Sequence, residues 1–169
     1  MKVLETHRLL LRWISTGDAA FILTLLNEPS WLRFIGDRGV RTLDEARNYI
    51  LKGPVDMYHR LGFGLYLTER KSDGVPIGIC GLIKRPGLDD VDIGFAFLPA
   101  YWSQGYAFES ATAVMDYGKT ALGLTRIVAI TTRDNHSSIK VLNSIGLQFD
   151  QMTRLAGDAE EVMLFACSV

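Results

Sequence analysis

DIGFAFLPAYWSQGYAFES, residues Asp92–Ser110, joins an expected strand to an expected helix. The strand ends at Leu98, before a proline, and the helix begins at Gly105. The small residues Ser103, Gly105 and Ala107 let backbone N–H groups come close to a ligand. Because the first N–H groups of a helix are free and its dipole favours negative charge, the segment predicts a phosphate or pyrophosphate cradle. A single Gly-rich turn is more often a plain strand–loop–helix connection, so this alternative stays open.

The elements on either side of this stretch alternate between strand and helix patterns. Expected helices cover Asp18–Asn27, Leu43–Lys52, Gly105–Leu122 and Ser137–Ser144, and Gly53-Pro54 is expected to interrupt the second before Val55–Leu61. Trp31–Ile35 is expected to be an apolar turn. Expected strands cover Thr6–Ile14, Phe63–Arg70, Val75–Lys84, Asp92–Leu98, Arg126–Thr132, Leu147–Leu155 and Val162–Cys167. This order predicts an α/β (α+β) fold with a mixed sheet.

Length and charge exclude several classes of protein. A chain of 169 residues fits one domain, 1–169. Its 18 basic and 19 acidic side chains give a net charge of −1, which argues against a nucleic-acid-binding domain and a polybasic membrane anchor. The sequence has neither a stretch of roughly 20 apolar residues nor a Cys/His cluster, so we expect no membrane span and no metal site. The expectation is a soluble, cytoplasmic protein.

A second polar segment, TTRDNHSSIKVLNSIGL at Thr131–Leu147, also follows a strand and leads into a helix. Asn135 and Ser138 can face a ligand beyond the carboxyl end of that strand, where α/β folds often bind ligands. Asn135 and Ser137 can equally well only cap the helix, and on this segment alone capping is the favoured interpretation.

Together the two segments resemble the GNAT superfamily of N-acetyltransferases, most closely its ribosomal-protein-alanine N-acetyltransferase-like branch. The opening TxRLxLR, here Thr6–Arg12, is similar to the start of that branch. DIGFAFLPAYWSQGYAFES and NHSSIKVLNSIGL resemble two of its later motifs, and the element order agrees over essentially the whole chain. The resemblance implies a GNAT-like acyl-CoA N-acyltransferase fold, with a mostly antiparallel central sheet of about seven strands flanked by helices.

The resemblance also implies acetyl-CoA as co-substrate and assigns its binding residues. In the superfamily the fourth strand pairs with the pantetheine arm and the following loop holds the pyrophosphate through backbone N–H groups. The loop's usual signature begins with Arg or Gln, but Trp102 occupies that position here, so we expect no cationic side chain at the pyrophosphate. The implied cofactor-binding residues are Phe97, Leu98, Trp102, Gln104, Gly105, Tyr106, Ala107, Phe108, Asn135, Ser138 and Asn143.

Acetyl transfer from a thioester requires a neutral amine, and an α-amine with a pKa of about 7.7–8.0 loses its proton easily. Asp92 lies where relatives often carry Glu and is the first candidate for general base or amine anchor; the alternative is a solvated strand-end carboxylate. Glu109 is the second acidic candidate, with a structural role favoured. The backbone N–H of Leu98 is the candidate donor to the thioester carbonyl. Ser138 is the hydroxyl available to the departing thiolate, or only binds CoA or caps its helix.

The acceptor is less well defined by the sequence. In the superfamily the variable first third shapes the acceptor pocket, so Trp31 and Phe34, with Asp92, are the substrate-binding candidates, although helix packing explains such aromatic residues equally well. The leading acceptor is a peptide or protein N-terminus. The alternatives are a small amine (polyamine, aminoglycoside or amino acid) and a non-catalytic module that senses CoA. The sequence leaves a monomer or a homodimer open.

Overall fold

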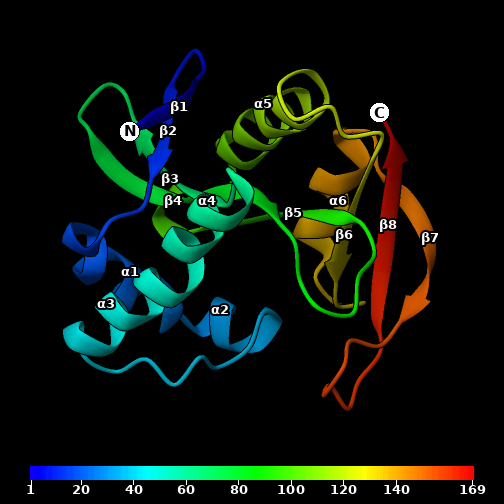
Figure 1. Cartoon of the computed structure of the whole chain (residues 1–169), viewed down its shortest axis with the longest axis horizontal. Helices are drawn as coiled ribbons and strands as arrows, with labels where there is room; N and C mark the ends of the chain where they lie inside the picture. Colours follow the sequence, from blue (N-terminus) through cyan, green and yellow to red (C-terminus); the bar gives the residue numbers. More distant parts are fainter.

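An eight-stranded sheet runs through the computed structural model, which describes all 169 residues (Figure 1). Its order is β1-β2-β3-β4-β5-β6-β8-β7, and every neighbouring pair except β5–β6 is antiparallel. The strands are β1 (Lys2–Glu5), β2 (Leu9–Trp13), β3 (Leu65–Arg70), β4 (Val75–Ile83), β5 (Val91–Phe97), β6 (Arg126–Thr131), β7 (Gln148–Thr153) and β8 (Val162–Ser168).

The parallel pair β5–β6 opens the sheet into a wedge. Only Val91 with Ile127 and Asp92 with Val128 are in register. Both strands continue beyond these pairs, β5 to Phe97 and β6 to Thr131. Since neighbouring strands of a sheet are held together by their backbone hydrogen bonds, the end of the pairing marks the point where the two strands separate. Asp92 therefore lies at the apex of the wedge.

Helices cover both faces of the sheet. They are α1 (Ala19–Leu26), α2 (Pro29–Phe34), α3 (Leu43–Ile50), α4 (Asp56–Leu61), α5 (Tyr106–Thr120) and α6 (His136–Ser144). Tyr106 and Val114 of α5 and Leu142 of α6 share one apolar cluster with the sheet, while α1, α2 and α3 share another that includes Leu67 and Ile79. Figure 1 shows α1–α3 grouped on the opposite side of the sheet from α5. No helix combines the length and apolar character needed to cross a bilayer.

The predicted fold class is confirmed, and three local predictions are wrong. The region predicted as one strand, Thr6–Ile14, is only β2, and the chain before it forms an additional edge strand, β1. Trp31 lies in helix α2 rather than in a turn, because Pro29 occupies the first helical turn, where a proline costs no hydrogen bond. Gly53-Pro54 does not interrupt the helix: a π-helical turn at Leu51–Val55 absorbs the proline and joins α3 to α4.

Candidate active site

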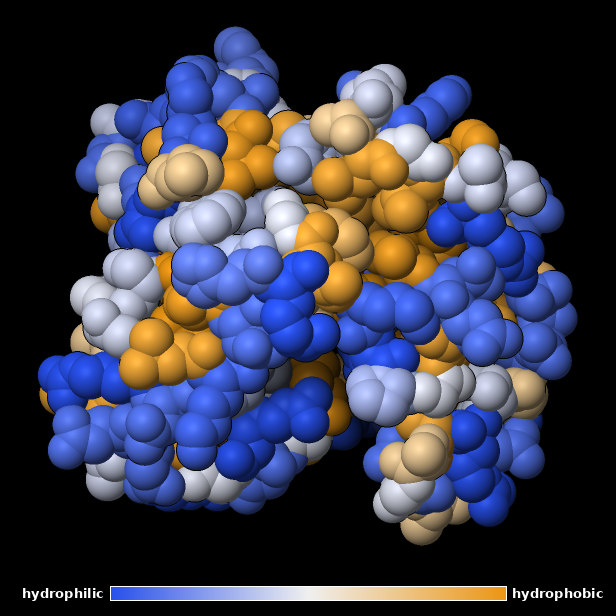
Figure 2. Space-filling model, in the orientation of Figure 1, coloured by the Kyte–Doolittle hydropathy of each residue, from blue (hydrophilic) through white to orange (hydrophobic).

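A cleft of about 1400 Å³ occupies the wedge and continues toward α2 and the β7–β8 hairpin. Its walls come from β5, β6, the start of α5, the start of α6 and the helical segment before β3. Figure 2 shows the molecule hollowed between the α1–α3 group and the β6–β8–β7 region, with hydrophobic atoms in the depth and hydrophilic ones at the rim. An apolar cleft with a few polar groups at a break in the sheet is the usual form of a small-molecule site.

Along β5, the N–H and C=O groups of successive residues point alternately toward β4 and into the wedge. The N–H of Leu98 donates to the carbonyl of Ile77 at 3.0 Å, so this group is bound within the sheet. The prediction that Leu98 donates to the thioester carbonyl is therefore wrong, and its side chain packs instead against the α1–α3 cluster. The antiparallel register with β4 then turns the backbone groups of Phe95 and Phe97 toward the wedge. The Phe97 carbonyl accepts the Trp102 indole N–H at 2.8 Å, which fixes the start of the next loop.

The loop before α5 presents free backbone donors. The first bond inside this turn is Glu109 N–H to Gly105 carbonyl at 3.0 Å, and the N–H groups of residues 103–108 have no protein partner. Two left-handed residues, Ser103 (φ 60°) and Gly105 (φ 82°), shape the turn. Successive N–H groups that face a helix start form a concave site for anions, so this turn fits a pyrophosphate. The Gln104 side chain is exposed and donates one of its amide N–H groups to the Ala100 carbonyl at 3.2 Å.

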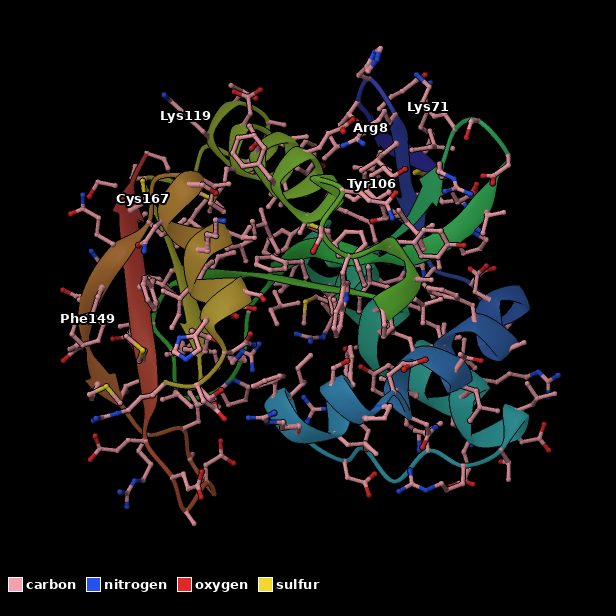
Figure 3. All side chains as sticks on the ribbon, turned by 180° about the vertical axis from the view of Figure 1, so that it is seen from behind. Arg8, Lys71, Tyr106, Lys119, Phe149 and Cys167 are labelled. Carbon is pink, nitrogen blue, oxygen red and sulfur yellow. The ribbon has the colours of Figure 1, made fainter.

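Glu109 lies outside the cleft and ties α5 to the N-terminal hairpin. Its carboxylate accepts the Thr6 hydroxyl at 2.7 Å, the Arg8 N–H at 2.8 Å and the Arg8 Nε at 2.7 Å. These contacts lower the pKa of Glu109 despite its partial desolvation and fit a structural role. Arg8 stacks on Tyr106 at 4.3 Å, as Figure 3 shows from behind. A Cβ added to Gly105 would lie 3.3 Å from Arg8 Nη2, so the guanidinium of Arg8, which is bound to Glu109, lies next to the turn but outside the cleft lining.

On α6, capping and ligand binding are compatible. The Asn135 side-chain oxygen accepts the Ser138 N–H at 3.3 Å, which makes Asn135 the N-cap, yet its amide nitrogen is free toward the cleft that it lines. Ser138 also lines the cleft, and its hydroxyl has no protein partner. Asn143 is exposed and lies outside the cleft lining. This position gives the predicted contact of Asn143 with the cofactor no support, and that contact stays a prediction.

The acceptor end of the cleft lies under α2 and the π-helical turn. Trp31 and Phe34 line it, as do Tyr49 and the Gly53-Pro54 pair. Trp31 is also 95% buried in the α1–α3 cluster, so this residue both packs between helices and lines the cleft. Single π-helical turns are frequently found at functional sites. Tyr58 instead donates its hydroxyl to the Leu65 carbonyl and is structural.

Asp92 is buried at the apex of the wedge, where its side chain is 1% exposed. Arg85, on the loop between β4 and β5, binds both carboxylate oxygens, with Nε at 3.1 Å and Nη2 at 3.0 Å. Desolvation raises the pKa of Asp92 to about 6, against the opposing effect of the Arg85 and Lys84 charges. Asp92 is thus not the solvated strand-end carboxylate of the alternative interpretation. A carboxylate with this pKa in a cleft is typical of an acid–base group.

The comparison with known protein families agrees with this geometry. Residues 8–148 match the acetyltransferase (GNAT) domain family. The chain is a GNAT acetyltransferase. The N-acetyltransferase YoaA of Bacillus subtilis (strain 168) is 29% identical over 154 residues, which are 90% of this chain and 86% of YoaA.

Two solved structures share the fold of this GNAT acetyltransferase. RimL, a ribosomal L7/L12 α-N-protein acetyltransferase solved in complex with coenzyme A, has a TM-score of 0.84 at 18% identity, covering 100% of this chain and 98% of RimL. The ribosomal-protein-S5-alanine acetyltransferase of Vibrio fischeri has a TM-score of 0.80 at 18% identity, covering 99% of this chain and 96% of that protein.

As a GNAT enzyme, the chain is an acetyl-CoA-dependent N-acetyltransferase, and its cleft fits that co-substrate. The free N–H groups of the α5 turn match the pyrophosphate, and the wedge-facing backbone of Phe95 and Phe97 can pair with an amide-containing arm. No group of three or more His, Cys, Asp and Glu side chains is arranged to hold a metal ion. Sequence reasoning missed Arg85, which stands in a turn with no motif around it.

Proposed function

We propose that the acceptor of this acetyltransferase is the α-amine of a peptide or protein N-terminus. The proposal rests on the charge of the cleft. Four cationic side chains line the cleft, Arg38, Lys84, Arg85 and Lys140, against the four carboxylates of Glu28, Asp92, Asp134 and Asp158, so the lining has no excess negative charge, and Asp92 is already bound by Arg85. A polyamine or an aminoglycoside would bring further ammonium groups to this surface, whereas a peptide brings one amine and neutral amides.

Two proteins of the same fold are named for acetylation of this kind of amine. RimL is named for α-N-acetylation of a ribosomal protein, and the Vibrio fischeri protein for acetylation of a ribosomal-protein alanine. The cleft is also long enough for a peptide, since it extends beyond Asp92 to Phe34 and Ile35 on one side and to Leu155 and Ala156 on the other.

In the proposed mechanism Asp92 receives the proton of the attacking amine. Acetyl-CoA supplies an acetyl group activated as a thioester; the amine nitrogen forms the new amide bond, and the carbon–sulfur bond breaks to release the CoA thiol. Because the Asp92 side chain is only 1% exposed, we propose that the proton reaches it through one water molecule. A weak base is sufficient, since an α-amine with a pKa of about 8 already exists partly unprotonated at pH 7.

The oxygen of the thioester carbonyl gains negative charge during the attack and needs a donor. With the Leu98 N–H bound to Ile77, we propose that the wedge-facing N–H of Phe97 takes this role. Ser138 provides a free hydroxyl on the opposite wall, and we propose that it donates a hydrogen bond to the departing thiolate, which takes up a proton from solvent while Asp92 returns the amine proton to solvent. Much of the rate enhancement would come from holding both reactants in one cleft.

Turnover tests the proposed function. The purified protein with acetyl-CoA and short peptides that have free α-amines should release CoA thiol at a rate that saturates with both substrates. The same peptides with a blocked N-terminus and a free Lys side chain serve as the control and should react far more slowly. Thiol release with spermidine or an aminoglycoside but not with any α-amine peptide would contradict the proposed acceptor. Stabilisation by CoA without turnover of any amine would indicate the non-catalytic module instead.

A further inference from the structure

Arg85 is the one side chain that contacts the proposed base, and it also lines the acceptor end of the cleft. Its Nε and Nη2 each donate a hydrogen bond to one oxygen of Asp92. A guanidinium has further N–H donors in the same plane, on Nη1 and on the outer side of Nη2. The Arg85 side chain is 29% exposed while Asp92 is 1% exposed, so the remaining solvent-facing edge of the pair belongs to Arg85.

We infer that Arg85 recognises the carbonyl group next to the acceptor amine by donating a hydrogen bond to its oxygen. This inference rests on the proposed function. In an aminoacyl N-terminus the amine nitrogen and the first carbonyl oxygen are held close together by the single Cα between them. The fixed Arg85–Asp92 pair offers a matching arrangement, with an acceptor for the amine proton on Asp92 and an N–H donor beside it on Arg85. A Lys side chain or a polyamine has no carbonyl at this distance from its amine.

The two hydrogen bonds from Arg85 to Asp92 hold the Arg85 guanidinium in a fixed orientation. A bidentate guanidinium–carboxylate pair fixes both planes, so the free N–H groups of Arg85 point in a set direction without an additional loss of side-chain freedom. The cleft has three other cationic side chains: Lys84 bonds the Leu88 carbonyl, and Arg38 and Lys140 are exposed. None of them forms a hydrogen bond with Asp92. Arg85 is therefore the positioned donor at the reacting amine and a specificity-determining residue.

The test compares two matched acceptors in the wild type and in Arg85→Gln. One acceptor is a short peptide amide with a free α-amine; the other, the reduced acceptor, has its first peptide group replaced by an alkene (CH=CH), which removes the carbonyl without adding a second basic amine. For both acceptors kcat/KM is expressed per unprotonated α-amine. Wild-type kcat/KM should favour the peptide by about 10-fold or more, the usual worth of a hydrogen bond to a charged group. Arg85→Gln should lose most of this preference by lowering kcat/KM for the peptide and changing the reduced acceptor little. Arg85→Lys, which keeps the charge without the fork, should recover only part of it.

Arg126→Gln is the control, because Arg126 also pairs with carboxylates, Asp90 through Nε at 3.1 Å and Asp150 through Nη2 at 3.4 Å, but outside the cleft lining. It should keep the wild-type preference. If Arg85→Gln lowers kcat/KM equally for both acceptors, or changes neither, the inference is overturned, since Arg85 then acts only on Asp92 or on folding. If wild-type enzyme acetylates neither acceptor but does acetylate a polyamine, the proposed function fails as well.

Discussion

Asp92→Asn should lower kcat by about 100-fold, equivalent to about 2.7 kcal/mol in the activation free energy. The asparagine keeps an oxygen for Arg85 but cannot accept a proton at neutral pH. Binding of CoA should not change, because its proposed contacts are the backbone of β5 and the α5 turn, and Asp92 makes none of them. Steady-state kinetics with a saturating peptide and a CoA titration followed by calorimetry measure the two effects separately.

The pH dependence of kcat tests the role of Asp92 independently. Burial raises the Asp92 pKa to about 6, and the carboxyl must be unprotonated to accept a proton. Wild-type kcat should therefore fall as the pH drops below about 6, and Asp92→Asn should lack this limb. Asp90→Asn, two residues earlier and half-exposed beside Arg126, is the matched control and should behave like wild type. If Asp92→Asn has the same kcat as the wild type, the amine loses its proton without the help of this base, and the assignment of Asp92 is contradicted.

Gly81→Ala should destabilise the fold by about 4 kcal/mol or more, among the largest effects of a single substitution. An added Cβ would lie 2.1 Å from the Gly64 carbonyl oxygen and 2.8 Å from the Leu65 Cα. Both are backbone atoms of the neighbouring segment, and Gly64 is itself bound to the Leu82 N–H at 3.2 Å, so they cannot move without breaking the β3–β4 contact. Thermal or denaturant unfolding measures the loss.

Gly94 supplies the control for this substitution, because it lies directly opposite Gly81 in the β4–β5 pair. A Cβ on Gly94 would meet only the Leu65 Cδ2 at an ordinary 3.6 Å. Gly94→Ala should therefore change the free energy of unfolding by less than about 1 kcal/mol. Equal stability of the two variants would contradict the close approach of β3 and β4 on which the cleft floor depends.

Motifs that depend on local chemistry could be predicted from the sequence. The strand–turn–helix from Asp92 to Ser110 is present, because a proline ends the strand and small residues permit the left-handed turn. Two helix starts are also stabilised by side chains three residues apart: the Asp18 carboxylate accepts the Ser15 N–H at 2.9 Å, and the Thr42 hydroxyl accepts the Glu45 N–H at 3.1 Å. Such features need only residues that are close together in the chain.

Features that depend on register or on distant residues could not be predicted. Whether Leu98 or Phe97 turns its N–H to the wedge is set by pairing with β4, and a shift of one residue reverses the answer. The contact of Arg85 with Asp92 depends on how the β4–β5 loop folds back over the sheet. Pro54 does not interrupt its helix because a π turn accommodates it, and such a turn has no clear signal in the sequence.

If acetyl-CoA binds in the wedge between β5 and β6, a crystal structure with CoA should show the pantetheine arm along Phe95 and Phe97. It should also show the pyrophosphate on the N–H groups of residues 103–108 and the thiol between Asp92 and Ser138. CoA bound outside the wedge, or with its pyrophosphate away from the start of α5, would rule out this site for the co-substrate.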